Sequence, residues 1–288
     1  MTVYFIGAGP GDPELITVKG QRLIRSCPVI IYAGSLVPTA VLEGHCAETV
    51  VNSAELHLEQ IIDLIKTAHA KGQDVARVHS GDPSLYGAIG EQIRYLRELD
   101  IPFQIIPGVT ATAACAALLG AELTLPDISQ SVILTRYADK TAMPVGEELG
   151  SLAQHGATMA IHLGVNHLEK ILAELLPHYG ADCPIAVIHR ATWPDQDWAV
   201  GTLEDIAAKV AAKGFRRTAL ILVGRVLGSD HFSESSLYRA GQRRKKKQKR
   251  KGKNTKQHKK TKVSNGTKRK EINKKIKKIG TQTLCNEK

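Results

Sequence analysis

Three short segments of small residues could together form a ligand-binding site. Residues 7–12, 81–83 and 107–111 are rich in glycine and proline, and each follows an apolar run typical of a buried strand. Glycine lets the backbone turn sharply and approach a ligand closely, and open α/β sheets bind ligands at the carboxyl ends of their strands. Asp82 adds an acid, and few bases lie nearby in the sequence. The three segments therefore suit a ligand with a cationic or hydroxyl-rich part better than a phosphate.

Two other interpretations of the first segment stay open at this point. The run Gly7-Ala8-Gly9-Pro10-Gly11-Asp12 is close to the dinucleotide fingerprint G-x-G-x-x-G, but its sixth residue is Asp12 rather than glycine. Pro10 also stiffens a loop that would have to wrap around a pyrophosphate. A glycine-rich connection that binds no ligand is the plainer alternative.

Strands that alternate with helices must position these segments. In the first half, strands are expected over residues 3–6, 28–32, 48–51, 74–78 and 103–106, and helices over residues 14–26, 56–70, 88–99 and 112–119. Short loops between alternating strands and helices favour a mostly parallel sheet. The carboxyl ends of parallel strands lie on one edge, so the three segments can converge on one pocket.

The second half repeats the alternation after a possible linker over residues 123–127. Strands are expected over residues 131–135, 159–163, 184–188, 198–201 and 218–224, and helices over residues 166–176 and 203–212. We therefore predict two α/β domains, residues 1–120 and 121–238, with the ligand-binding cleft between them.

The net charge of +11 combines two different parts of the chain. Residues 239–288 contain 22 Lys and Arg but 2 Asp and Glu, whereas residues 1–238 contain 17 basic and 26 acidic residues. The first 238 residues therefore carry a formal charge of −9 and should not bind nucleic acid by general electrostatics. A strongly basic tail could do so.

The cysteines and the N-terminus predict a cytoplasmic protein. Cys27, Cys46, Cys115, Cys183 and Cys285 are scattered without a C-x-x-C pair, so we expect reduced cysteines in ordinary core positions and no metal site. The chain enters a strand at once, without a visible signal peptide. No apolar run approaches 18 residues, so we expect no membrane span.

The three segments, in this order and at this spacing, resemble the cofactor loops of the tetrapyrrole (corrin/porphyrin) methylases. The resemblance covers about residues 2–238. It implies an α/β fold in which a mostly parallel N-terminal sheet and a mixed C-terminal sheet flank an active-site cleft. It also implies S-adenosyl-L-methionine as the methyl donor, a tetrapyrrole substrate and a homodimer.

Two further stretches are similar to one branch of that family. Residues 32–37 (YAGSLV) and 53–59 (SAELHLE) resemble the members that methylate carbon C-11 of a corrin precursor in cobalamin biosynthesis. Ala33 stands where many relatives carry aspartate, which weakens the alternative of a uroporphyrinogen-III methylase. Methylation of another ring position or another tetrapyrrole stays open, as does the presence of cobalt in the substrate.

The resemblance also implies which residues contact the cofactor. These are Pro10 in the first loop, Asp82 and Leu85 in the second, Thr110 and Ala111 in the third, and Leu163, Ala191 and Ala219 in the second domain. The last three would form apolar walls and backbone donors for adenine. Leu163 replaces a methionine found in some relatives. Asp82 could instead simply cap its own turn, because Asp-Pro is a common turn pair.

Other residues are candidates for contacts with the substrate. Five arginines could bind its carboxylates, because guanidinium binds carboxylate in a bidentate manner: Arg77, Arg94, Arg97, Arg136 and Arg190, with Arg136 and Arg190 preferred. His57, His79 and Tyr86 are equally consistent with ordinary structural roles. The sequence identifies no general base, and a sulfonium methyl group needs no activated protein nucleophile.

The basic tail has two interpretations. Residues 242–278 consist almost entirely of Lys, Arg, Asn, Gln, Thr, Gly and Ile. Such a segment has little to bury and repels itself, so we expect disorder and no part in catalysis. An out-of-frame extension through adenine-rich sequence would give this composition, because these residues share adenine-rich codons. A nucleic-acid tether is the alternative.

Overall fold

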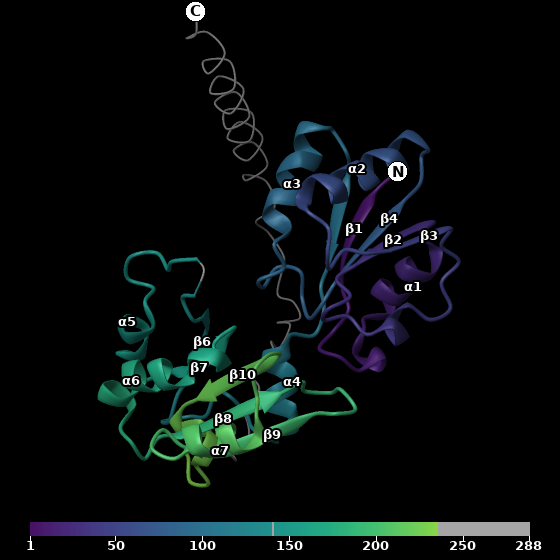
Figure 1. Cartoon of the computed structure of the whole chain (residues 1–288). Helices are drawn as coiled ribbons and strands as arrows, with labels where there is room; N and C mark the ends of the chain where they lie inside the picture. The colour runs from purple at the N-terminus through teal and green to yellow at the C-terminus, as the bar shows by residue number, and fades with distance from the viewer. Residues whose placement is uncertain (140, 236–288) are drawn as a thin grey trace, which may run out of the picture. The chain divides into compact units, whose positions relative to one another are not determined.

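The strands of the described residues form two five-stranded sheets, each covered by helices (Figure 1). The structure is a computed structural model that describes residues 1–139 and 141–235. The predicted basic tail lies outside the described residues. The expected α/β class, with one parallel and one mixed sheet, is confirmed.

The first sheet is entirely parallel. Its strands are β1 (Val3–Gly7), β2 (Val29–Tyr32), β3 (Thr49–Asn52), β4 (Val75–His79) and β5 (Phe103–Ile106), in the order β3-β2-β4-β1-β5. β1 pairs with both β4 and β5 in parallel register. The strands that precede the three predicted loops are therefore neighbours, and their carboxyl ends lie side by side.

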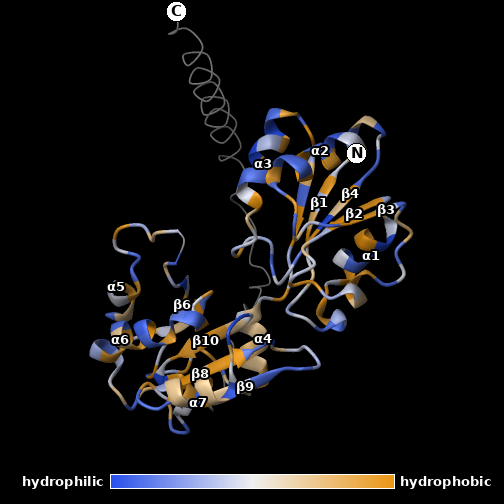
Figure 2. Cartoon of the chain, viewed as in Figure 1, coloured by the Kyte–Doolittle hydropathy of each residue, from blue (hydrophilic) through white to orange (hydrophobic). Residues whose placement is uncertain are grey.

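Helices cover both faces of this sheet. Successive side chains along a strand point to opposite faces, and here apolar side chains on both faces are buried. Phe5 and Ile31 pack against α2 (Leu58–Ala70) and α3 (Ile89–Glu98). Ile6 and Ile30 pack on the other face against α1 (Val18–Ser26). Figure 2 shows the resulting pattern, with hydrophobic strands between helices that carry hydrophilic outer faces.

The second sheet is mixed. Its strands are β6 (Val132–Arg136), β7 (Thr158–His162), β8 (Pro184–His189), β9 (Asp197–Thr202) and β10 (Ala219–Val223), in the order β6-β7-β10-β8-β9. β6 is parallel to β7, whereas β10 is antiparallel to both β7 and β8. The ends of β6, β7 and β8 and the start of β10 therefore lie on one edge.

Helices cover both faces of the second sheet. α5 (Leu149–Ala153), α6 (Leu168–Tyr179) and α7 (Ile206–Lys213) pack with the core on one face. α4 (Ala111–Leu118) packs its alanines and Cys115 against the other face. The third loop thus leads from a strand of the first sheet to a helix on the second. The domain boundaries near residues 120 and 238 stay a prediction.

Three local expectations were wrong. α5 was not anticipated, and α6 continues through Pro177 to Tyr179, although we expected it to end at Leu176. Tyr179 is buried and donates a hydrogen bond of 2.5 Å to the carbonyl oxygen of Ala157, which favours this continuation. Cys46 is exposed, while Cys27, Cys115 and Cys183 are buried as expected. Cys285 lies outside the described residues.

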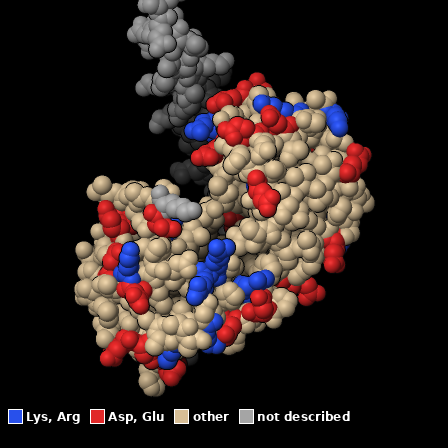
Figure 3. Space-filling view, in the orientation of Figure 1, with Lys and Arg blue, Asp and Glu red and all other residues tan. Residues whose placement is uncertain are grey.

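Figure 3 shows Asp and Glu spread over the face drawn rather than gathered in one patch. No helix in residues 1–139 or 141–235 is long and apolar enough to cross a membrane.

Candidate functional site

The three predicted loops meet at their glycines. An added Cβ on Gly7 would lie 2.6 Å from both the Cα atom of Gly108 and the carbonyl oxygen of Gly81, closer than real Cβ atoms approach. Gly9 and Gly81 also exchange two backbone hydrogen bonds, of 3.3 and 2.7 Å. The predicted convergence of the loops is confirmed, and it depends on the absence of side chains at these positions.

Asp82 is a structural link between two of these loops. Its Oδ2 accepts a hydrogen bond of 2.8 Å from the backbone N–H of Gly108, while Oδ1 accepts one of 2.8 Å from the backbone N–H of Ser84 and another from the Ser84 hydroxyl. Burial raises the pKa of Asp82, but these three hydrogen bonds outweigh that effect and the net pKa is lowered. Asp82 therefore does cap its own turn, as one interpretation held, and it also holds the third loop in place.

The positions in the second half that were expected to contact adenine lie on one edge of the second sheet. Leu163 follows β7, Ala191 lies two residues after β8, and Ala219 begins β10. Leu163 is 67% exposed although it is a large apolar residue, and its φ of +55° is rare for a residue with a branched side chain. Strained backbone of this kind gathers at ligand-binding sites.

The same strain recurs in the neighbouring turns of this edge. Arg190, Thr192 and Thr218 have φ angles of +47°, +71° and +52°. The backbone N–H of Arg190 donates a hydrogen bond of 2.9 Å to the carbonyl oxygen of Thr218, which ties two of these turns together. The edge is therefore held in an unusual conformation at several adjacent points.

The four remaining predicted cofactor positions belong to the first three loops. Pro10 is buried, and Leu85 is half-buried and donates its N–H to the carbonyl oxygen of Asp82 at 3.1 Å. Thr110 is the N-cap of α4, and its hydroxyl accepts a hydrogen bond of 3.2 Å from the N–H of Ala113. Ala111 is the first residue of that helix. The N–H groups of a first helical turn suit an anionic group such as a carboxylate.

Tyr86, Thr112 and His162 join the loops to the second sheet. Of these three residues, the sequence alone indicated only Tyr86. The Nε2 atom of His162 lies 3.2 Å from the hydroxyl oxygen of Thr112, and the ring of His162 lies 5.1 Å from that of Tyr86. Burial lowers the pKa of His162 to about 4, so its imidazole is neutral at physiological pH. A polar aromatic residue at the end of the apolar run 159–161 was the only signal in the sequence.

Residues 32–37 and 53–59, the two stretches that resemble one branch of the family, are neighbours in space. The backbone N–H and the hydroxyl of Ser53 both donate to the carbonyl oxygen of Tyr32, at 2.9 and 3.1 Å. The side-chain oxygen of Asn52 accepts a hydrogen bond of 3.0 Å from the N–H of Gly34. The two stretches follow adjacent parallel strands, so they share the edge at which the three glycine loops also lie.

Of the five candidate arginines, two have guanidinium groups that already donate to other groups of the protein. Arg77 is buried, and it donates to Gln92 and to the carbonyl oxygen of Ile31. Arg136 donates to the carbonyl oxygens of Tyr137, Thr141 and Ala142, so it holds its own loop. Arg94 and Arg97 are exposed on α3.

Both candidate histidines lie at the ends of secondary-structure elements. His57 lies at the N-cap of α2, where its backbone N–H donates to the side chain of Gln60 at 2.8 Å. His79 is buried at the end of β4, and its Nε2 has no hydrogen-bond partner among the described residues. Burial, with a smaller effect of the charge on Arg77, lowers the pKa of His79 to about 3.

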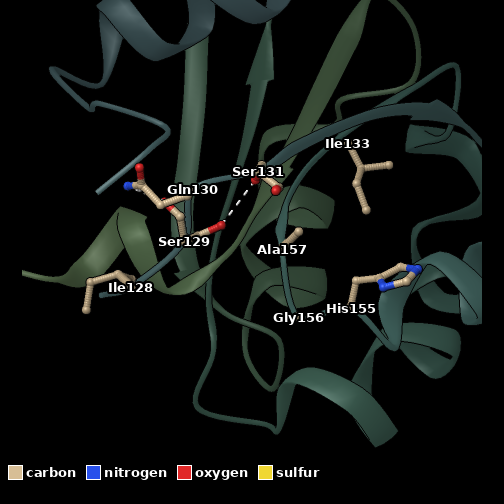
Figure 4. A pocket seen from close by; sticks show the side chains of 8 residues that line it. All are labelled: Ile128, Ser129, Gln130, Ser131, Ile133, His155, Gly156 and Ala157. Carbon is tan, nitrogen blue, oxygen red and sulfur yellow. Dashed lines mark hydrogen bonds between the residues drawn. The ribbon is translucent and has the colours of Figure 1, made fainter. Parts of the chain in front are cut away.

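A separate pocket of about 450 Å³ lies at the start of β6 and β7. Figure 4 shows Ser129, Ser131 and His155 among its lining residues. Because β6 and β7 are parallel, this pocket lies at the opposite edge of the sheet from Leu163. It therefore belongs to a different part of the molecule from the converging loops.

Comparison with known families and proteins gives a consistent result. Residues 2–207 match the model of the family described as Tetrapyrrole (Corrin/Porphyrin) Methylases. The precorrin-4 C(11)-methyltransferase of Pseudomonas aeruginosa is 75% identical over 243 residues, which cover 84% of this chain and 97% of that protein.

Solved structures agree with this comparison. The X-ray structure of a cobalt precorrin-4 methyltransferase, a cobalamin biosynthetic enzyme, is 40% identical with a TM-score of 0.77, and the match covers 79% of this chain and 96% of that one. A uroporphyrin-III C-methyltransferase from Thermus thermophilus, complexed with S-adenyl homocysteine, is 30% identical with a TM-score of 0.65. That match covers 79% of this chain and 94% of the other.

Proposed function

This chain belongs to the tetrapyrrole (corrin/porphyrin) methylase family, and from that premise we propose that it methylates precorrin-4, or its cobalt form, at ring carbon C-11 in cobalamin biosynthesis. The methyl donor is S-adenosyl-L-methionine. The observation that carries the choice of substrate is the 75% identity to a precorrin-4 C(11)-methyltransferase over 97% of that relative's length.

The residues at the converging loops fit this cofactor. The N–H groups that begin α4, at Ala111 and Thr112, suit the carboxylate of its amino-acid part. Leu163 offers an exposed apolar surface for adenine, and Ala191 and Ala219 are small enough to leave room beside it. Pro10, Asp82, Leu85 and Thr110 shape the loops from the other side. This assignment is supported by the neighbour that was solved with S-adenyl homocysteine.

The protein's contribution to the reaction is to hold two reactants in alignment. The bound cofactor supplies an electrophilic methyl group on a sulfonium ion, which an electron-rich tetrapyrrole carbon can attack directly. Alignment of two bound reactants can lower the barrier by about 7–11 kcal/mol. Glycine contacts, the Asp82 link and the strained turns fix the loops, so their backbone groups need little rearrangement on binding.

The direct test is the structure of the product. The purified protein is added to a reconstituted pathway that supplies precorrin-4, and mass spectrometry and NMR locate the new methyl group. We expect one added methyl at C-11, together with calorimetric binding of S-adenosylhomocysteine at one site per chain. A methyl at C-17 or C-20, or methylation of uroporphyrinogen III instead, would refute the proposed substrate. Absence of S-adenosylhomocysteine binding would refute the proposed cofactor.

We also propose that the working form is a homodimer, as the resemblance implies, and that it is cytoplasmic, as the cysteines and the N-terminus predict. Light scattering of the purified protein should give about twice the mass of one chain, 31.2 kDa. A monomeric mass at catalytic concentrations would contradict the dimer without affecting the proposed reaction. Fractionation of the source cells with an antibody against the chain should place it in the cytoplasmic fraction.

A further inference from the structure

A second pocket, of about 640 Å³, lies between three loops that are distant in the sequence. One wall is formed by residues 11–13 after β1, another by Pro38 and Ala40 after β2, and the third by Arg190 and residues 192–195 after β8. The first loop is one of the converging cofactor loops, and Pro38 directly follows the stretch 32–37. The pocket therefore borders the proposed cofactor site.

Trp193 is a fixed platform in this pocket. Its indole Nε1 donates a hydrogen bond of 2.9 Å to the carbonyl oxygen of Pro10. Its ring lies so close to Gly11 that a Cβ added there would collide with it. The neighbouring Thr192 hydroxyl accepts a hydrogen bond of 3.0 Å from the backbone N–H of Asp12. Two independent contacts thus attach the loop that bears Trp193 to the first cofactor loop.

The guanidinium of Arg190 lies over this platform, and its Nε atom has no hydrogen-bond partner among the described residues. The guanidinium carbon is 4.1 Å from the centroid of the Trp193 ring, a cation–π geometry that orients the planar group. Asp195 Oδ1 lies 3.0 Å from the Arg190 Nε atom, yet Nε donates no hydrogen bond within the described residues, so the contact is an ion pair without an aligned hydrogen bond. The side chain of Asp195 is 58% exposed, so a competing anion can reach the pair.

We propose that Arg190, stacked on Trp193, is a subsite for a carboxylate of the tetrapyrrole substrate. In the absence of substrate, the carboxylate of Asp195 holds the guanidinium near the position in which it binds substrate. A substrate carboxylate then takes the place of Asp195 and accepts two parallel hydrogen bonds from the guanidinium. Planar guanidinium matches carboxylate in this bidentate manner, and stacking on an aromatic ring reduces the freedom lost when the bonds form. This inference rests on the proposed function, because it takes the ligand to be a tetrapyrrole with carboxylate arms.

The cofactor also carries a carboxylate, so the experiment must separate the two sources. KM and kcat for methyl transfer to precorrin-4 are measured at saturating S-adenosyl-L-methionine, and the Kd of S-adenosylhomocysteine is measured by calorimetry. For Arg190→Met we expect a KM for precorrin-4 at least tenfold higher, a kcat within threefold and an unchanged Kd for S-adenosylhomocysteine. Arg216→Met, at an exposed position outside the pocket, is the matched control and should change none of these.

Two further variants keep the test decisive if Arg190→Met does not fold. Arg190→Lys keeps the charge but lacks the planar fork, so its KM should rise threefold to tenfold. Asp195→Asn removes the competing carboxylate, so its KM should fall or stay unchanged.

The outcomes separate this proposal from the proposed function. An unchanged KM in a folded Arg190→Met or Arg190→Lys variant that still transfers methyl groups would overturn the subsite alone. A Kd for S-adenosylhomocysteine that rises together with KM would assign Arg190 to the cofactor carboxylate instead. A wild-type protein that binds S-adenosylhomocysteine but does not methylate precorrin-4 would refute the proposed substrate, and the subsite with it.

Discussion

The Oδ2 atom of Asp82 accepts a hydrogen bond of 2.8 Å from the backbone N–H of Gly108, which joins the loops after β4 and β5. Asp82 is 9% exposed, and both of its oxygens already accept hydrogen bonds from the protein. Its proposed part in cofactor binding is therefore indirect: through Gly108 it fixes the loop that leads into α4. This relationship motivates the first prediction.

Replacing Asp82 with alanine should weaken both the fold and cofactor binding. The variant leaves the N–H of Gly108 without its partner in a partly buried position, which costs about 1–3 kcal/mol. We expect the free energy of unfolding in urea to fall by that amount and the Kd of S-adenosylhomocysteine to rise at least tenfold. Asp63→Ala, which removes an exposed acid on α2, is the control and should change stability by less than about 0.5 kcal/mol. Equal effects of the two substitutions would contradict the role of Asp82.

The close contact between the glycines predicts opposite effects for two glycine-to-alanine substitutions. A Cβ on Gly108 would lie 2.8 Å from the Cα atom of Gly7 and would also collide with the carbonyl oxygen of Gly81. Gly108→Ala should lower the free energy of unfolding by about 1–3 kcal/mol, because the packed loops must separate. Gly90→Ala lies in α3 with no atom within 4 Å of its added Cβ, so it should raise stability by up to about 1 kcal/mol.

Thermal melts and S-adenosylhomocysteine calorimetry on the two glycine variants provide the measurement. The Gly108→Ala variant should melt at a lower temperature and bind less tightly than the Gly90→Ala variant. If Gly108→Ala were as stable and bound as tightly as the wild type, the loops would not depend on this close approach.

His79, which is buried, and His162, which is half-buried, should make the fold sensitive to mild acid. The pKa of His162 is lowered to about 4 by burial, and the pKa of His79 to about 3. Above the ordinary pKa of 6.5 both histidines are neutral in the folded and unfolded states, so they contribute no pH dependence. Below pH 6.5 the two histidines become protonated in the unfolded chain but stay neutral in the folded protein until the pH approaches their lowered pKa values. Each histidine therefore removes about 1.4 kcal/mol of stability per pH unit as the pH falls from 6.5 towards its folded pKa.

Urea titrations between pH 4.5 and 7.5 measure this effect. His162→Gln should make stability less dependent on pH, by up to about 1.4 kcal/mol per unit, because one of the two groups is lost. His69→Gln, at an exposed position on α2, should leave the dependence as in the wild type. Identical pH profiles for His162→Gln and the wild type would show that His162 is protonated as readily in the folded state as in the unfolded state.

A chain that ends at Tyr238 should retain cofactor binding and methyl transfer. Residues 239–288 carry 22 basic and 2 acidic residues and few apolar side chains that could pack against the catalytic part. Rates and S-adenosylhomocysteine affinity of the shortened chain should stay within twofold of the full chain. As a control, a chain that ends at Lys213 loses β10, the central strand of the second sheet, and should not fold.

Loss of methyl transfer in a folded chain ending at Tyr238 would make the tail part of the site. Nucleic-acid binding by the full and the shortened chain tests the interpretation of the tail as a tether. If the full chain binds nucleic acid in a salt-dependent way and the shortened chain does not, the tail acts as an appendage to the enzyme.

The sequence by itself determined the strands, most of the helices and the loops that carry the proposed chemistry. Short, largely apolar runs mark β1 and β4, helical periodicity marks α2, and glycine and proline mark the loops, because each of these signals depends on neighbours within a few residues. The resemblance of three loops and two stretches to one family added the substrate class and the proposed cofactor. The sequence alone does not predict α5, because its five residues are too few to show a helical period.

Only the tertiary structure decided which distant groups meet. The partner of Asp82, the attachment of Trp193 to Pro10 and the packing of α4 on the second sheet all depend on strand order and on the direction of β10. The same holds for the arginines: Arg77 is buried and Arg136 donates to carbonyl oxygens, whereas Arg190 lines the pocket, paired with Asp195, and its Nε donates no hydrogen bond within the described residues. Residue type fixes the charge and shape of a side chain, but its partners are set by residues up to 183 positions away, whose placement no local pattern records.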